Sequence, residues 1–263
     1  TDCVGPQATI TVTVSSTPVA PTVSDVSYCL NDAATALTAT ALTGHTLVWY
    51  DASQAGITTP TPSTSSVGPI TYYVAQATAS GCEGPKSLVT VTINALPVAP
   101  VATSTIAYCK DATATALTAT ASGSHTLVWY DTDGTTVLSG APTPSTSSVG
   151  NTPYYVAQKK TSTGCVGPQS TITVSINPLP VVPSTTTTID YCEDDVASVL
   201  TATATAGHTL VWYGSDGTTV LGGAPTPSTS VVTPTNYYVA QKNTLTDCVG
   251  PQATITVTVS STP

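Results

Sequence analysis

Apolar and polar residues alternate along several short stretches of the chain, with the period of two that is typical of half-buried β-strands. In residues 170–176, written STITVSI, the aliphatic residues Ile172, Val174 and Ile176 share one face, and the intervening Thr and Ser residues share the other. The runs TLVWY and YYVAQ are also predicted strands, with aromatic and β-branched residues on the core face. No stretch shows a helical period, so the pattern predicts an all-β protein.

The same blocks of sequence recur three times in the same order. The only tryptophans, Trp49, Trp129 and Trp212, lie in the repeated block LVWY and are separated by 80 residues (from 49 to 129) and 83 residues (from 129 to 212). The blocks YC, LTATA, PTPSTS, YYVAQ and GP keep the same step. A fixed period of this length indicates tandem copies of one structural module.

The first eighteen residues, 1–18, are identical to the last eighteen, 246–263. The two stretches are 245 residues apart, which is three module steps, so we expect a larger three-module unit that was copied whole within a longer native chain. The predicted domains are the C-terminal strand or strands of a preceding repeat at 1–17 and three repeats at 18–99, 100–182 and 183–263.

Turn and linker signals separate the predicted strands. Asp131–Leu138 and Gly214–Leu221 place Asp-Gly between strand-like runs, which predicts tight hairpins, and the first module has a two-residue-shorter hairpin. The linkers Thr17–Pro21, Leu96–Pro100 and Leu179–Pro183 carry prolines that favour an extended, fairly stiff backbone. Modules of about 80 residues with evenly spaced short strands predict small antiparallel β-sandwiches.

The charge of the chain excludes several classes of partner. Charged residues make up 7% of the sequence, with five cations and a formal net charge of −9. Nucleic-acid binding and a polybasic membrane patch both need clustered cations, so neither is expected. No apolar run approaches the ~20 residues that span a bilayer, so we expect no membrane insertion.

Seven cysteines occupy two positions in the repeat, one early and one late. This spacing predicts one disulfide within each domain: Cys29–Cys82, Cys109–Cys165 and Cys192–Cys248. Cys3 is a late cysteine, and we expect its partner upstream of residue 1. The cysteines lack the clustering of a zinc site, so they indicate disulfides formed in an oxidising compartment.

Histidines and acidic residues are the other candidates for chemistry. The histidines His45, His125 and His208 enter equivalent strands in separate modules, which keeps them too far apart to share a metal. Asp194 and Asp195 are the candidate ligands for calcium, but calcium needs six to eight oxygen ligands and this cluster offers few. No other cofactor is expected. No catalytic triad, carboxylate pair or phosphate loop is present, so we expect no enzyme activity.

The doubled tyrosines of YYVAQ should place one ring in the core and one on the surface. Tyr72, Tyr154 and Tyr237 are therefore candidates for a repeated binding surface. Exposed tyrosines are also ordinary on a protein surface, so the feature alone does not identify a ligand.

Taken together, YC, LTATA, LVWY, APTPSTS, YYVAQ, GC, GP and ITVTV resemble the bacterial immunoglobulin-like repeat of Bacteroidota. That repeat occurs in very large surface proteins that carry the C-terminal sorting domain of the type IX secretion system. The resemblance covers all three modules and implies tandem Ig-like sandwiches exported across the outer membrane to the cell surface. One feature departs from antibody-type domains, because Cys82 lies nine residues after Tyr73, past the end of YYVAQ. We therefore expect each disulfide to tie the end of its module to that module's first strand.

The resemblance implies a non-enzymatic stalk or spacer in a cell-surface adhesin, in some cases one linked to gliding motility. Neighbouring Ig-like repeats are then its expected partners. Two alternatives remain open. The modules could associate with other copies of the chain in a multi-chain extracellular filament, or each module could bind surface glycans.

Overall fold

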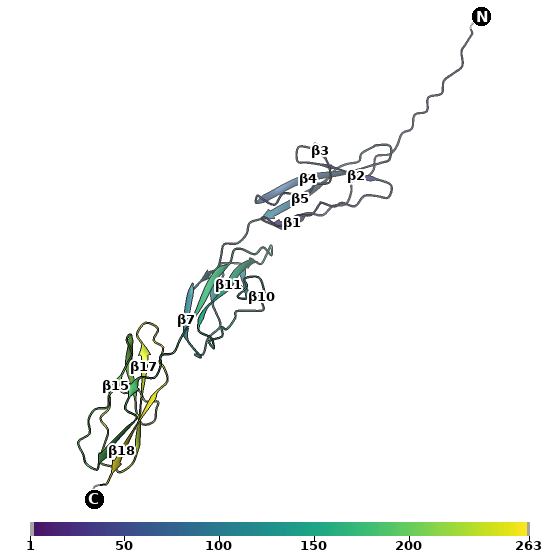
Figure 1. The fold of residues 1–263 in the computed structure, drawn as a ribbon. Coiled ribbons are helices and arrows are strands. Elements are labelled where there is room, and N and C mark those ends of the chain that lie inside the picture. The colour runs from purple at the N-terminus through teal and green to yellow at the C-terminus, as the bar shows by residue number, and fades with distance from the viewer. Residues whose placement is uncertain (1–2, 262–263) are drawn as a thin grey trace. The chain divides into compact units, whose positions relative to one another are not determined.

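A computed structural model shows the protein as an all-β chain and describes residues 3–261 (Figure 1). Eighteen strands lie within this range, and they fall into three sets that follow the three sequence repeats. The described chain contains no helix with the length and apolarity that crossing a bilayer requires.

Repeat 1 forms one five-stranded sheet with the spatial order β1-β5-β4-β2-β3. An isolated antiparallel bridge between Thr22 and Thr40 adds a minimal second pairing. The strands are β1 (Val26–Cys29), β2 (Thr46–Tyr50), β3 (Gly56–Ile57), β4 (Gly68–Ala77) and β5 (Ser87–Asn94).

Repeat 2 has a five-stranded sheet with the order β10-β9-β11-β12-β7 and a two-stranded sheet of β6 and β8. The two-stranded sheet occupies the place of the single bridge in repeat 1. The strands are β6 (Val101–Ala102), β7 (Thr105–Cys109), β8 (Ala119–Thr120), β9 (His125–Tyr130), β10 (Val137–Leu138), β11 (Gly150–Lys160) and β12 (Ser170–Asn177).

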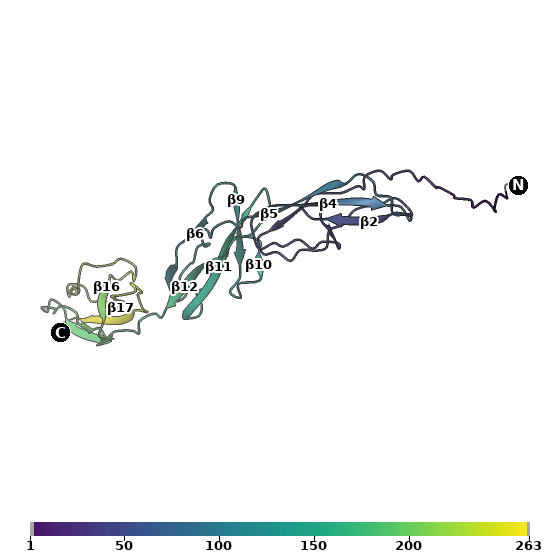
Figure 2. The ribbon, with the colours of Figure 1, turned by 90° about the horizontal axis from the view of Figure 1, so that it is seen from above.

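Repeat 3 has a four-stranded sheet with the order β14-β18-β17-β16 and a two-stranded sheet of β13 and β15. Figure 2 shows β16 beside its antiparallel partner β17. The strands are β13 (Ser184–Thr185), β14 (Thr188–Cys192), β15 (Ala202–Thr203), β16 (His208–Tyr213), β17 (Thr235–Asn243) and β18 (Ala253–Ser260).

One pairing departs from the antiparallel sandwich that the sequence predicts. The first strand of each main sheet runs parallel to the last strand: β1 to β5, β7 to β12 and β14 to β18. In repeat 1 the register places Cys29 beside Asn94, so both strands finish at the same end of the sheet. The early cysteine therefore lies where the chain leaves the repeat.

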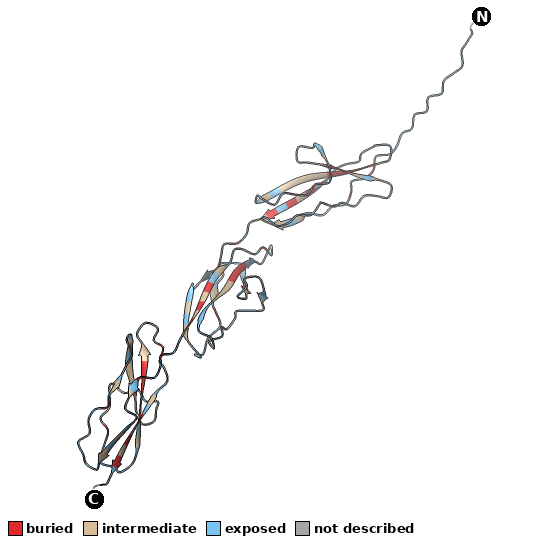
Figure 3. Ribbon diagram, in the orientation of Figure 1, coloured by how far each residue is buried: buried red, intermediate tan, exposed pale blue. Residues whose placement is uncertain are grey.

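The central strands carry the cores, and the predicted alternation is confirmed (Figure 3). In β12 the exposed fractions of Ile172, Val174 and Ile176 are 0%, 1% and 4%. Each repeat adds a buried tryptophan and a buried leucine from LTATA. These pairs are Leu37 with Trp49, Leu117 with Trp129, and Leu200 with Trp212.

The sequence ATITVTVS occurs twice with different structures. At residues 253–260 it forms β18, paired on both sides with β14 and β17, and Ile255 is fully buried. At residues 8–15 it forms no strand, and Ile10 is 87% exposed. The predicted strand at 1–17 is thus not formed over described residues 3–17, because a strand of this composition depends on partner strands for its hydrogen bonds and its buried face.

Grouped by Cα proximity, the chain forms two compact units whose boundaries do not follow the repeats. Of the described residues, the first unit holds 3–99 with 121–127 and 157–169, the last of which carries Cys165. The second unit holds 100–120, 128–156 and 170–261. Part of repeat 2 thus groups with repeat 1.

The Asp-Gly hairpins form as predicted. In repeat 2, β9 pairs with β10, and Gly134 between them has a φ of 69°, in the left-handed region that favours glycine. In repeat 3 the Asp216 carboxylate accepts hydrogen bonds from the backbone of Thr218 and Thr219 and from the Thr219 hydroxyl. Repeat 1 makes a shorter hairpin of the same kind, closed by a bond from Asp51 N to Ala55 O.

We expect the turn at Asp216 to weaken in strong acid. The three hydrogen bonds lower the pKa of Asp216 to about 2, chiefly through the Thr219 hydroxyl and backbone amide. Because this value lies below the ordinary pKa of about 3.9, the stabilisation is complete above about pH 4 and is lost as the pH falls through 2. A carboxyl-carbon NMR titration should show Asp216 still ionised at pH 3, and a midpoint near 4 would contradict the assignment.

Candidate functional site: disulfide junctions between consecutive repeats

The histidines are strand-entry residues held by local backbone contacts. His45 Nδ1 lies 3.1 Å from Thr43 O, and His208 Nδ1 lies 3.0 Å from Ala206 O. His125 contacts the carbonyl oxygen of Ser122, three residues before it. Among residues 3–261 no group of three His, Cys, Asp or Glu side chains is placed to hold a metal ion.

The acidic residues that follow the early cysteine shape a turn. Asp194 has a φ of 63°, and Asn31 and Asp111 take the same left-handed conformation, which Asn and Asp tolerate better than other side chains. The Asp195 carboxylate accepts a hydrogen bond from Cys192 N at 2.7 Å, as Asp32 does from Cys29 N. The calcium candidates Asp194 and Asp195 therefore have local roles in the turn that carries the early cysteine.

The tyrosines proposed as a binding surface are half-buried. Tyr72 packs against the core of repeat 1 and Tyr237 against the core of repeat 3. Burial raises the pKa of both Tyr72 and Tyr154. In repeats 1 and 3 these rings lie on the core side of their strand, and a binding surface at the three tyrosines stays a prediction. The strand register points them inward because they alternate with the neighbouring tyrosine.

Repeat 1 contains a polar cluster that has no signal in the repeat pattern. The Tyr50 hydroxyl donates a hydrogen bond to Glu83, and Lys86 Nζ lies 3.2 Å from the centre of the Tyr50 ring. The bond to Glu83 is the main reason that the pKa of Tyr50 rises to about 12. Val166 and Val249 replace Glu83 in repeats 2 and 3, so the cluster is particular to repeat 1.

Hollows in the surface are small and lie beside short strands. One of about 210 Å³ is lined by residues 101–103 and 118–120, next to β6 and β8. Another of about 180 Å³ lies beside Thr22 and Thr40 in repeat 1. Neither brings together titratable side chains, so neither has the convergent polar groups of a typical ligand site.

The disulfides join different repeats. Cys29 of repeat 1 is bonded to Cys165 of repeat 2, and Cys109 of repeat 2 is bonded to Cys248 of repeat 3. The predicted pairings Cys29–Cys82, Cys109–Cys165 and Cys192–Cys248 are therefore wrong. In both bonds the early cysteine of one repeat meets the late cysteine of the next.

The parallel direction of the first strand explains why each early cysteine is bonded to the next repeat. Cys29 is the last residue of β1 and lies at the same end of the sheet as Asn94, the last residue of β5. Cys82 lies at the opposite end of the sheet, because it follows β4 and precedes Ser87, the first residue of β5. The eight residues of β5 span about 23 Å at a rise of ~3.3 Å per residue, whereas a disulfide needs Cα atoms 4.4–6.8 Å apart. A bond within the repeat cannot form.

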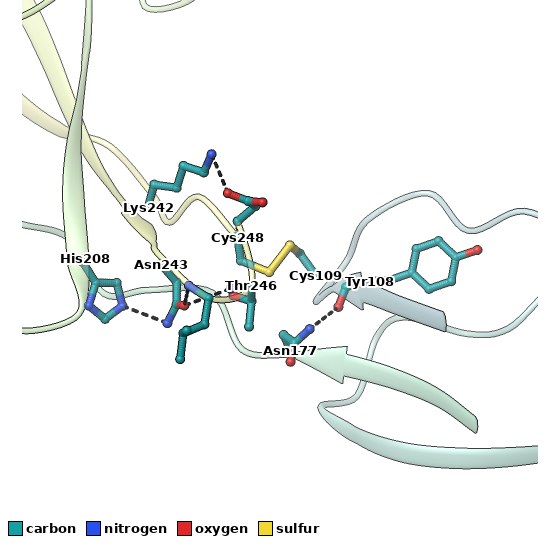
Figure 4. Close-up of a disulfide and its surroundings, with 10 residues drawn as sticks. Tyr108, Cys109, Asn177, His208, Lys242, Asn243, Thr246 and Cys248 are labelled. Carbon is teal, nitrogen blue, oxygen red and sulfur yellow. Dashed lines mark hydrogen bonds and ion pairs between the residues drawn. A yellow bond between two sulfur atoms is a disulfide. The ribbon is translucent and has the colours of Figure 1, made fainter. Parts of the chain in front are cut away.

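The late cysteine lies in a hairpin that extends from the long central strand. In repeat 3 the loop is closed by a hydrogen bond from Asn243 N to Cys248 O and by a bridge between Lys242 and Val249. Figure 4 shows Cys248 bonded to Cys109, with the Asn177 side chain donating to Tyr108 O nearby. Cys248 is fully buried and Cys165 is 1% exposed, so in each disulfide the late cysteine is shielded from solvent.

A buried glutamine fixes each linker to the repeat that follows it. In repeat 3 the Gln241 amide donates to Val181 O at 2.7 Å and accepts from Thr205 N at 2.8 Å. Gln76 and Gln158 make the same two contacts in repeats 1 and 2. The glutamine that ends YYVAQ in all three repeats is the sequence signal for this contact. The interpretation of YYVAQ as a strand did not identify its role.

The glycine of each GP block allows the linker to pack closely. A Cβ on Gly250 would lie 2.3 Å from Pro180 O, and one on Gly167 would lie 2.3 Å from Pro97 O. The linker prolines Pro97 and Pro180 are buried. The linkers are thus docked segments of the next repeat as well as extended Pro-rich connections.

Cys3, Cys82 and Cys192 form no disulfide in the described chain. Cys3 and Cys192 are exposed, and Cys82 is partly buried. Cys192 is the last residue of β14 and lies in a turn like that of Cys29 in repeat 1. In both turns the backbone amide of the cysteine donates to an aspartate carboxylate. The expected upstream partner of Cys3 stays a prediction.

The family model described as "Ig-like domain CHU_C associated" matches residues 18–95, 97–178 and 180–261. No curated protein matches the sequence.

Solved structures that match the chain include other tandem β-domain proteins. The fibronectin(III)-like modules of Clostridium thermocellum CbhA share 13% identity, with a TM-score of 0.34, over 59% of this chain and 91% of that one. Chicken CNTN1 domains FN1–FN3 share 15% identity, with a TM-score of 0.31, over 92% and 98%. Sidekick-1 immunoglobulin domains 1–4 share 12% identity, with a TM-score of 0.27, over 91% and 74%.

Peptide mapping without reductant should confirm the connectivity. The cleavable cations are Lys86, Lys110, Lys159, Lys160 and Lys242. Cleavage after lysine in urea should give peptide 1–86 joined to 161–242, and peptide 87–110 joined to 243–263, because these pairs hold the bonded cysteines. Disulfides within repeats would instead join 87–110 to 161–242, which would overturn the assignment.

Replacing Gln241 by Ala should destabilise repeat 3 by about 2–4 kcal/mol, because Val181 O and Thr205 N would lose their partner in a buried site. Hydrogen exchange of β17 and β18 measures the change. Gln252→Ala is the matched control, since exposed Gln252 makes one surface hydrogen bond to Gly217 O. Equal effects of the two substitutions would show that the linker anchor contributes nothing.

Proposed function

Because the chain belongs to the family of CHU_C-associated Ig-like domains, we propose that it is a non-enzymatic spacer in an adhesion-type protein displayed outside the cell. The observation that carries this proposal is the covalent bonding of consecutive repeats by Cys29–Cys165 and Cys109–Cys248. A spacer holds its two ends at a set distance, and covalent bonds between consecutive repeats help to maintain that distance.

The local chemistry supports the same function. The residues that recur in all three repeats act in the core, in turns or in linker anchoring, as Trp49, Thr64 and Gln76 show in repeat 1. A spacer needs these structural residues and no others. The packing of Tyr72 and Tyr237 against the cores of repeats 1 and 3 favours the spacer over the glycan-binding alternative.

The disulfides also support an extracellular location, because such bonds persist in oxidising compartments. Export across the outer membrane by the type IX system and a link to gliding are finer parts of the proposal. They rest on the sequence resemblance and on the CHU_C association of the family.

A replacement experiment tests the spacer function. In cells that display the protein, residues 18–263 are either deleted or replaced by three unrelated Ig-like domains that bind no ligand. We expect deletion to reduce attachment to a surface and replacement to restore it, because a spacer depends on length and not on side chains. Surface labelling with antibody controls for display.

Attachment that fails equally with deletion and with replacement would contradict the spacer function. The repeats themselves would then carry the binding surface. A glycan or a second copy of the chain would be the next partner to examine.

A further inference from the structure

Each junction between repeats contains two covalent connections. Repeats 1 and 2 are joined by the peptide chain from Asn94 to Pro97 and also by the disulfide Cys29–Cys165. Repeats 2 and 3 are joined by the chain after Asn177 and also by Cys109–Cys248. Tension along the protein can therefore follow either route.

Each route runs along one strand of repeat 2, β7 in the first and β12 in the second, and bypasses the rest of that repeat. The first leaves repeat 1 at Asn94, runs along the chain to Cys109 and crosses to repeat 3. The second leaves repeat 1 at Cys29, crosses to Cys165 and runs along the chain to Pro180. Each route contains 15 residue steps, from 94 to 109 and from 165 to 180, and residues 110–164 lie on neither.

We infer that the disulfides form a load bypass, so that a repeat can unfold under tension without the protein lengthening substantially. Fifteen residues extend to about 50 Å at ~3.4 Å per residue. A repeat of about 80 residues without a bypass would extend to about 270 Å. This inference goes beyond the spacer function, because it concerns the purified chain under load and holds wherever the protein is displayed.

The bypass also limits the terminal repeats. When repeat 1 unfolds alone, tension reaches Cys29 and passes into folded repeat 2 through Cys165, so only residues 18–29 are released. When repeat 3 unfolds alone, Cys248 is held by Cys109, so only residues 248–261 are released. The bulk of each repeat remains as a slack loop outside the tensioned path.

The limit persists when all three repeats are unfolded. The shortest covalent path through both disulfides uses the segments 18–29, 109–165 and 248–261. These amount to about 80 residues, or about 270 Å at full extension, whereas the reduced chain from 18 to 261 would reach about 830 Å. The middle segment is traversed from its C-terminal to its N-terminal end, because Cys165 follows Cys109 in sequence.

Single-molecule force spectroscopy of the whole protein, held at its two ends, tests the bypass. Without reductant we expect the first unfolding event of a terminal repeat to release about 11 or 13 residues, and the total release to be about one third of that with reductant. Events of about 26 residues would indicate disulfides within repeats, and events of about 80 residues would indicate none. Either result overturns the proposal.

Matched variants separate the two bonds. C29S/C165S should restore the full release of repeat 1 while leaving the small release of repeat 3, and C109S/C248S should do the reverse for repeat 3. C82S/C192S is the control, because both residues are free thiols and their loss should leave the traces unchanged. Circular dichroism and the release sizes under reductant confirm that each variant is folded. A C29S/C165S variant indistinguishable from the control would also overturn the proposal.

Discussion

The structure depends on the parallel pairing of the first strand of each repeat with the last. This pairing places Cys29 next to Asn94, at the end of the sheet where the chain leaves repeat 1. The early cysteine is thereby separated from the late cysteine of its own repeat by the length of β5, and it is presented to the following repeat. The junctions between repeats and the load paths through them follow from this arrangement. The disulfides themselves require an oxidising environment.

The junction combines covalent and non-covalent connections with different tasks. The disulfide joins the sheet end of one repeat to a hairpin of the next, whereas the buried glutamine and the close-packed glycine hold the linker on the repeat it enters. A disulfide resists separation at any force that leaves covalent bonds intact. The hydrogen bonds of Gln241 remove the slack that the linker would otherwise contribute.

Much of the fold could be predicted from the sequence because it depends on local pattern. The alternation in 170–176 identified the buried face of β12, and Asp-Gly identified the hairpin of β9 and β10. The disulfide partners could not be predicted, because every early cysteine is chemically equivalent to every other. Counting residues favours the nearest late cysteine, and only the direction of β1 against β5 excludes it. The inward position of Tyr72 depends likewise on strand register.

The duplicated octapeptide ATITVTVS separates what sequence determined from what tertiary structure decided. The sequence by itself determined the repeat, the two cysteine positions and the period-two pattern in both copies. Tertiary structure decided that Val257 is buried in β18 while the identical Val12 is 81% exposed, because only residues 253–260 have β14 and β17 beside them. The hydrogen bonds and the buried face of a strand depend on the neighbouring strands as well as on its own sequence. For the same reason the sequence supplied the cysteines, and the direction of the neighbouring strand selected their partners.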